Sequence, residues 1–218
     1  PDGDNNFPGN VIANVTYTLT EDNAIDIQYN ATTDKKTIIN MTNHSYFNLN
    51  GDPSISSMNQ VLYLAADSIT PVDDTFMTNG TMMAVTGTPF DFNTPKSIDQ
   101  DVTNFDNEQI KFGKGFDHNW VLKTKGDIHQ VAAQLTSPNT GITLEVYTDE
   151  PGIQVYTGNF LDGTVKGKKG IVYPQRASVC LETQHYPDSP NKKHWPSVVL
   201  EPGKTYTSHC IFKFGVIK

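Results

Sequence analysis

The 218-residue sequence has few cysteines, few positive charges and no long hydrophobic run. Its 16 Lys and Arg residues face 24 Asp and Glu residues, which gives a formal net charge of −8, and Arg176 is its one arginine. Nucleic acids and anionic membrane surfaces bind through clustered cations, so this charge balance argues against nucleic-acid and membrane partners. No apolar segment approaches the roughly 20 residues that a membrane-spanning helix needs.

The two cysteines, Cys180 and Cys210, lie in apolar, strand-like segments and lack C-x-x-C spacing. Buried free thiols are the favoured interpretation, and a disulfide is the alternative. The acidic pairs at residues 73–74 and 149–150 lack the further spaced oxygen ligands that calcium takes. The sequence therefore predicts no metal site. It leaves the compartment open between a cytoplasmic location, which is the default, and a periplasmic or secreted one.

Alternating polar and apolar residues recur in short segments separated by turns. Residues 10–20 and 24–31 predict one β-hairpin, and residues 129–137 and 143–148 predict another pair of strands. Further strands are expected at residues 36–42, 60–65, 120–124, 154–157, 179–182 and 207–216. Loops are expected at residues 69–80 and 87–101, the second with a short helical turn. No stretch keeps a helical period, so the pattern predicts one all-β domain over residues 1–218, a sandwich or a barrel.

Three segments place reactive side chains at the end of an apolar strand. They are residues 42–49 (TNHSYFNL), 115–120 (GFDHNW) and 181–188 (LETQHYPD). Side chains at such positions can face a cleft while the strand itself stays rigid. His44 and Glu182 are therefore candidates for acid–base chemistry.

Each candidate also has a structural interpretation. A lone Glu after a strand is usually solvated, and a lone His in a turn usually bonds to the backbone. Asp117 could cap the glycine-rich turn at residues 113–115, and His118 and Trp120 are expected to be structural. Four further aromatic residues are expected to form cleft walls or core: Tyr46, Phe47, Tyr156 and Phe160.

The longer motifs resemble those of the aldose 1-epimerase family. The family's T-N-H-x-Y-F-N-L and G-F-D-H segments match residues 42–49 and 115–118. A signature close to E-P-G-x-Q-x-Y-T-G-N-F-L-D-G matches residues 150–163, and the family's base segment, L-E-T-Q-H-x-P-D-S-P-N, matches residues 181–191. The resemblance covers nearly the whole chain, and the first and last motifs are long enough to be specific.

The resemblance implies roles for four residues. Glu182 would be the general base, His44 the general acid, and Asp117 and Gln154 would bind sugar hydroxyls. The implied fold is a large antiparallel β-sandwich, the galactose mutarotase-like supersandwich. No metal or organic cofactor is implied, the implied partner is a neutral monosaccharide such as galactose or glucose, and a monomer and a dimer both remain open.

The implied activity is the interconversion of the α and β anomers of free hexoses by ring opening and closure. A proton must leave the C1 hydroxyl and another must reach the ring oxygen, so we expect Glu182 and His44 on opposite sides of the sugar. One alternative is a non-catalytic carbohydrate-binding β-sandwich. Another is a hexose-6-phosphate 1-epimerase, which would need cationic phosphate contacts that a single arginine scarcely supplies.

Family members usually carry a further N-terminal portion before the PDG-x-x-x-x-PGN loop, which matches residues 1–10. That portion contributes strands, a substrate-binding Arg and a second active-site His. We therefore expect the chain to be the C-terminal part of a longer family domain, incomplete at its N-terminus.

Overall fold

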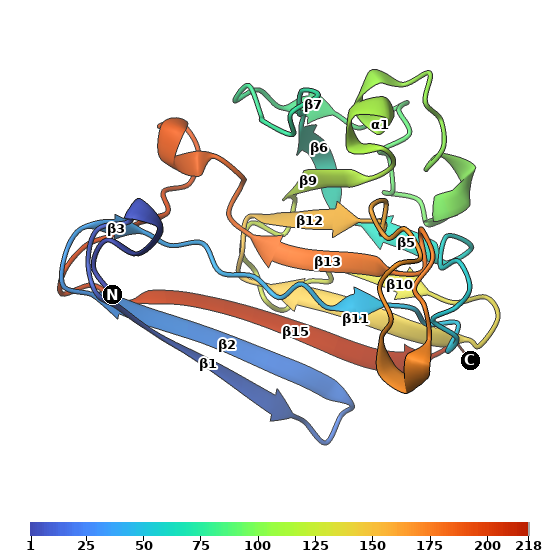
Figure 1. The fold of residues 1–218 in the computed structure, drawn as a ribbon, viewed down its shortest axis with the longest axis horizontal. Coiled ribbons are helices and arrows are strands. Elements are labelled where there is room, and N and C mark those ends of the chain that lie inside the picture. Colours follow the sequence, from blue (N-terminus) through green and yellow to red (C-terminus); the bar gives the residue numbers. More distant parts are fainter. Residues whose placement is uncertain (218) are drawn as a thin grey trace.

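Two antiparallel sheets carry most of the regular structure in the computed structural model, which describes residues 1–217 (Figure 1). The first sheet has seven strands, in the order β1 (Val11–Leu19), β2 (Ala24–Thr33), β15 (Tyr206–Val216), β11 (Ile142–Thr148), β10 (Ala133–Thr136), β5 (Val61–Leu64) and β8 (Lys96–Ser97). The second has six, in the order β4 (Tyr46–Phe47), β13 (Val179–Gln184), β12 (Gly152–Tyr156), β9 (Asp117–Leu122), β6 (Ala66–Thr70) and β7 (Met83–Ala84).

The remaining regular elements are short. β3 (Thr37–Ile38) pairs with β14 (Val199–Leu200), and α1 (Glu108–Gly113) is the one α-helix within residues 1–217. Four single turns of 3₁₀-helix lie at Asp4–Asn6, Ile98–Gln100, Lys168–Gly170 and Ser189–Asn191. In the described part of the chain, no helix has the length and apolar character needed to span a membrane.

The core lies between the inner faces of the two sheets. Leu62 and Leu144 from the seven-stranded sheet belong to the same buried cluster as Ile69, Trp120 and Ile153 from the six-stranded sheet. Two antiparallel sheets that share one apolar layer form a β-sandwich. The predicted all-β, antiparallel sandwich is therefore confirmed, and both cysteines are buried and free, as expected.

The predicted hairpins are confirmed, with shifts at their ends. β1 pairs with β2 across the turn at residues 21–23, and β10 pairs with β11. The strand expected at residues 36–42 shrinks to β3, and the one expected at residues 120–124 begins three residues earlier, at Asp117. The region at residues 87–101 contains both the expected helical turn and the short strand β8.

β6 and α1 are among the elements that the sequence did not predict, because local signals for them are weak. β6 follows β5 after a single residue, so the two strands merge into one apolar segment in the sequence. α1 has six residues, too few to show a helical period. Its start is set by Asn107, whose side chain accepts hydrogen bonds from the backbone N–H groups of Gln109 and Ile110. Its end is set by Lys114, which adopts a left-handed conformation with φ of 56°.

Trp120 anchors the core beneath the six-stranded sheet. Its side chain is fully buried, its Nε1 donates a hydrogen bond of 3.0 Å to the backbone carbonyl of Phe90, and its ring packs against Phe90, Phe92 and Phe116. A large aromatic with a satisfied polar atom contributes strongly to stability.

We expect Trp120→Ala to lower the free energy of unfolding by about 3–5 kcal/mol, because it opens a cavity and leaves the Phe90 carbonyl unpaired. Urea denaturation measures this loss. Leu19→Ala on the exposed strand β1 is the control, with an expected change within about 0.5 kcal/mol. A loss below about 1 kcal/mol for Trp120→Ala would contradict the assignment of Trp120 as the anchor.

Candidate active site

Strand register places Glu182, Gln154 and Asn119 in one row across the six-stranded sheet. β13 pairs Glu182 with Gln154 on β12, and β12 pairs Gln154 with Asn119 on β9. Residues directly opposite each other in an antiparallel ladder point to the same face, and their sequence neighbours point to the other. His118 and Trp120, which flank Asn119, are accordingly buried in the core. The row therefore projects from the outer face of the sheet.

A second row lies beside the first and consists of Tyr46, Cys180, Tyr156 and Asp117. β4 pairs Tyr46 with Cys180. If that register is continued by two residues, His44 stands opposite Glu182. The proximity of the predicted acid and base thus follows from the pairing of a two-residue strand with β13.

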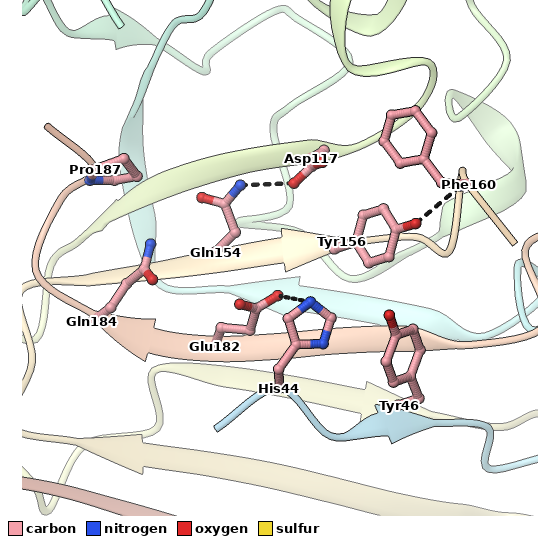
Figure 2. Close-up of a pocket in the computed structure, with 9 residues that line it drawn as sticks. All are labelled: His44, Tyr46, Asp117, Gln154, Tyr156, Phe160, Glu182, Gln184 and Pro187. Atoms are coloured by element: carbon pink, nitrogen blue, oxygen red, sulfur yellow. Dashed lines mark hydrogen bonds and ion pairs between the residues drawn. The ribbon is translucent and has the colours of Figure 1, made fainter. Parts of the chain in front are cut away.

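These rows border an open pocket of about 460 Å³ (Figure 2). It is lined by His44, Tyr46, Asp117, Gln154, Tyr156, Phe160, Glu182, Gln184 and Pro187. All four predicted site residues therefore lie around one pocket. Gln184 and Pro187 were not singled out from the sequence, although the two-residue spacing of Gln184 from Glu182 on one strand could have indicated it.

The aromatic residues divide between the pocket and the core. Tyr46, Tyr156 and Phe160 line the pocket, whereas Phe47 packs edge-to-face on Phe212, with ring centroids 5.1 Å apart. His118 is structural, as expected: burial lowers its pKa to about 3, so its ring is neutral at physiological pH.

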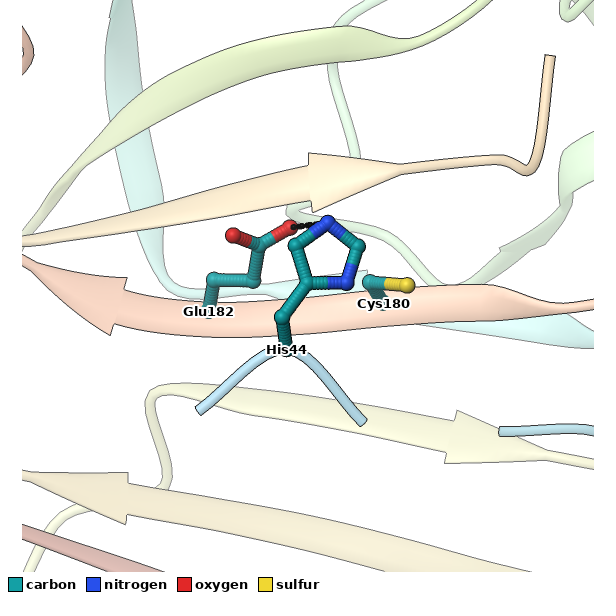
Figure 3. Close-up of side chains that lie close together, drawn as sticks. All are labelled: His44, Cys180 and Glu182. Atoms are coloured by element: carbon teal, nitrogen blue, oxygen red, sulfur yellow. Dashed lines mark ion pairs between the residues drawn. The ribbon is translucent and has the colours of Figure 1, made fainter. Parts of the chain in front are cut away.

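His44 and Glu182 make a direct contact in the pocket (Figures 2 and 3). His44 Nε2 lies 3.3 Å from Glu182 Oε1. The carboxylate is largely buried, while the imidazole is about half exposed at the mouth of the pocket. This distance leaves no room for a pyranose between the two groups, so the expectation that they flank the sugar on opposite sides is wrong. A bound sugar would have to lie over the pair.

The pKa of Glu182 rises from its usual value of 4.5 to about 8, chiefly because burial penalises the charged carboxylate and secondly because Asp117 adds a like charge. Below about pH 8 most of the Glu182 carboxyl groups therefore carry a proton, and only the ionised fraction can act as a general base.

Asp117 is held by a side chain and not by the glycine-rich turn before it. Gln154 Nε2 donates a hydrogen bond of 2.8 Å to Asp117 Oδ1 (Figure 2). Burial raises the pKa of Asp117, and the bond from Gln154 and the charge of His44 act in the opposite direction. The alternative of a turn cap is wrong, because Asp117 belongs to β9 and its side chain points into the pocket.

Within residues 1–217, one group of side chains offers three metal-ligand atoms within 4.8 Å of one another: His44, Cys180 and Glu182 (Figure 3). Metals bind cysteine as the thiolate. Burial raises the pKa of the Cys180 thiol far above its usual range, with smaller contributions from Glu182 and Asp117, so this sulfur is held in the neutral form. The group is accordingly better suited to acid–base chemistry than to holding a metal.

The raised pKa of Glu182 predicts a pH-dependent stability. In the folded chain the carboxyl keeps its proton up to about pH 8, whereas in the unfolded chain it loses it near pH 4.5, so stability falls as pH rises between these values. Glu182→Gln removes this penalty. We expect the variant to match the wild type in melting temperature near pH 4 and to exceed it above about pH 8. Thermal denaturation across this range measures the difference, and parallel curves for the two proteins would contradict the raised pKa.

Comparisons with known proteins identify the family of the chain. The family model for aldose 1-epimerase matches residues 1–213. Galactose mutarotase from Mus musculus is 43% identical over 216 residues, which cover 99% of this chain and 61% of the relative. Aldose 1-epimerase from Escherichia coli K12 is 42% identical over 98% of this chain and 61% of its own length. The chain therefore spans about three fifths of the length of these curated relatives.

Solved structures give the same result. A GalM/aldose epimerase homologue from C. elegans superposes with a TM-score of 0.89 at 30% identity, covering 100% of this chain and 64% of the other. Galactose 1-epimerase from Lactobacillus acidophilus superposes with a TM-score of 0.85 at 32% identity, covering 100% of this chain and 61% of the other. The sequence match and the fold agree over nearly the whole chain, which belongs to the aldose 1-epimerase family.

Proposed function

We propose that this chain carries the acid–base pair of an aldose 1-epimerase that interconverts the α and β anomers of free hexoses such as galactose and glucose. The observation that supports this most is the contact of His44 with Glu182 in a pocket that also presents Asp117 and Gln154. The names of the relatives, galactose mutarotase and aldose 1-epimerase, support the same reaction.

The 3.3 Å separation fits the geometry of ring opening. The C1 hydroxyl oxygen and the ring oxygen are both bonded to C1, so a base for one and an acid for the other must stand side by side. Glu182 takes the proton of the C1 hydroxyl while protonated His44 gives its Nε2 proton to the ring oxygen. The bond between C1 and the ring oxygen then breaks, and the open-chain aldehyde forms.

Ring closure returns both groups to their starting states. After rotation about the C1–C2 bond, neutral His44 removes the proton of the C5 hydroxyl, and this oxygen attacks the carbonyl carbon from the other face. The carbonyl oxygen takes the proton from Glu182 and becomes the new C1 hydroxyl. Each proton is returned to the group that supplied it, so the pair needs no exchange with solvent between turnovers.

Asp117 and Gln154 hold the sugar over this pair. The bond between Gln154 Nε2 and Asp117 Oδ1 fixes both side chains, and Gln154 Oε1 has no partner within residues 1–217. The carboxylate of Asp117 lines the pocket, and its oxygens are acceptors that suit the hydroxyls of a neutral sugar. The rings of Tyr46 and Tyr156 form a wall beside them.

The hexose 6-phosphate alternative is disfavoured by the charges around the pocket. Its lining contains no Lys or Arg among the described residues. Arg176 is directed elsewhere, because its Nη2 donates to the backbone carbonyl of Lys114. The pocket lining itself would therefore supply no cationic partner for a phosphate, and the ammonium of Lys114 lies over the ring of the lining residue Phe160, with Nζ 5.0 Å from its ring centroid.

We expect Glu182→Gln to reduce the rate of mutarotation by roughly 10²- to 10⁴-fold, because the amide cannot accept the C1 proton. Polarimetry on freshly dissolved α-D-galactose measures the rate. Glu201→Gln, an exposed residue paired with Lys36, is the matched control and should keep wild-type activity. Full activity in Glu182→Gln would contradict its assignment as base. A wild-type protein that binds galactose without accelerating mutarotation would favour the non-catalytic alternative.

A further inference from the structure

A second cavity, of about 260 Å³, adjoins the acid–base pocket. The two share four lining residues: Asp117, Gln154, Phe160 and Pro187. The remaining walls of the second cavity come from the end of β6, the loop that follows it, and Asn119 on β9. The second cavity is therefore continuous with the pocket on the side away from His44.

Asn119 is buried in the wall of this cavity with its hydrogen-bonding capacity unused. Its side chain is about 1% exposed, and neither Nδ2 nor Oδ1 has a partner within residues 1–217. A buried amide without partners is costly, so such groups in folded proteins call for an explanation. The mechanism above does not use Asn119, and no structural contact accounts for its amide.

The amide of Asn119 packs closely against Gly152 on β12. Gln154 on β12 lies directly opposite Asn119, and Glu182 on β13 lies opposite Gln154. Gly152, two residues before Gln154 on β12, lies diagonally from Asn119. A Cβ atom at Gly152 would lie 2.5 Å from Asn119 Oδ1, so a residue with a side chain there would displace the amide. Glycine at this position therefore allows Asn119 to keep its orientation.

Phe76 and Phe160 make part of the wall of the second cavity aromatic, and the backbone of Phe76 is strained. Phe76 has a φ of 64°, a left-handed conformation that bulky residues rarely adopt. Its loop is held by Asp73, whose side chain accepts hydrogen bonds from the backbone N–H groups of Thr75 and Met77. The ring of Phe76 meets Phe160 edge-to-face, with centroids 5.8 Å apart, and stays partly exposed. Such strain persists where the surrounding structure enforces it and is concentrated at ligand sites.

We propose that Asn119 binds a hydroxyl of the sugar and that the second cavity is the subsite for the part of the ring remote from C1. An amide donates through Nδ2 and accepts through Oδ1, which matches a hydroxyl that does both. The aromatic wall of Phe76 and Phe160 packs against the apolar C–H face of the ring. No Lys or Arg among the described residues lines the cavity, which suits a neutral ligand. This proposal rests on the sugar site proposed above.

The subsite makes stability and binding respond to mutation in opposite ways. Asn119→Leu replaces an unpaired amide with an apolar side chain of similar size, so the melting temperature should equal or exceed that of the wild type. The dissociation constant for galactose, measured by isothermal titration calorimetry, should rise roughly ten- to hundredfold because a hydroxyl loses its partner. A structural role for Asn119 would instead lower the melting temperature and leave the dissociation constant unchanged.

A series of deoxygalactoses lacking the hydroxyl at C2, C3, C4 or C6 identifies the contact. One of these sugars should bind the wild type more weakly than galactose does. The same sugar should bind Asn119→Leu as tightly as it binds the wild type, because the deoxy sugar and the substitution each remove the same hydrogen bond. An equal loss for all four sugars would overturn the proposal. Asn119→Ala is the second variant if the leucine does not fit, with the same expected pattern across the series.

Ser208→Ala is the matched control. Ser208 is buried on β15 of the other sheet, and its Oγ likewise has no partner within residues 1–217. Its replacement should leave sugar affinity unchanged. Because affinity is read directly, the experiment is independent of turnover: a wild type that binds galactose without catalysis would contradict the proposed function and still test Asn119.

Discussion

The pairing of β4 with β13 is the constraint on which the site depends. With Tyr46 opposite Cys180, His44 falls opposite Glu182, and the pairing of β13 with β12 and of β12 with β9 carries the same row across the sheet. A shift of one residue in any of these ladders would turn one strand's polar side chains into the core. The site residues therefore face the pocket together only when the strands of this sheet pair in the observed register.

The inner face of the six-stranded sheet stabilises the fold, and its outer face carries the candidate site. On the inner face, Trp120 and its phenylalanine neighbours fill the core, and Trp120 Nε1 donates a hydrogen bond to the Phe90 carbonyl. On the outer face, Glu182 has a pKa raised to about 8, and Asn119 has an unpaired amide. Both are unfavourable to folding, and the core on the inner face offsets their cost. Proteins commonly hold such unfavourable groups where ligands bind.

The sequence predicted an all-β sandwich or barrel because alternation is strong in the long strands, such as β2 and β15, and the family resemblance implied the sandwich. It could not predict β4, because two residues carry no period and the strand forms only through its partner β13. For the same reason, motif resemblance could name His44 and Glu182 but not their separation. The expectation of a sugar between them failed because the distance depends on cross-strand pairing, which single-strand patterns do not encode.

Asn119 is a second case in which the sequence did not indicate a candidate site residue. It lies two residues from Asp117, within a segment already recognised, and strand alternation places both on one face. Asn119 is a candidate because its side-chain amide has no hydrogen-bond partner within residues 1–217, and only the packed structure reveals this.

The most direct test of this account is a crystal structure of the protein with galactose bound. The account predicts the pyranose lying over the His44–Glu182 pair, with the C1 hydroxyl oxygen within about 2.6–3.2 Å of the Glu182 carboxylate and the ring oxygen at a similar distance from His44 Nε2. A sugar whose C1 points away from this pair, or a sugar bound with only one of the two groups in reach, would contradict it.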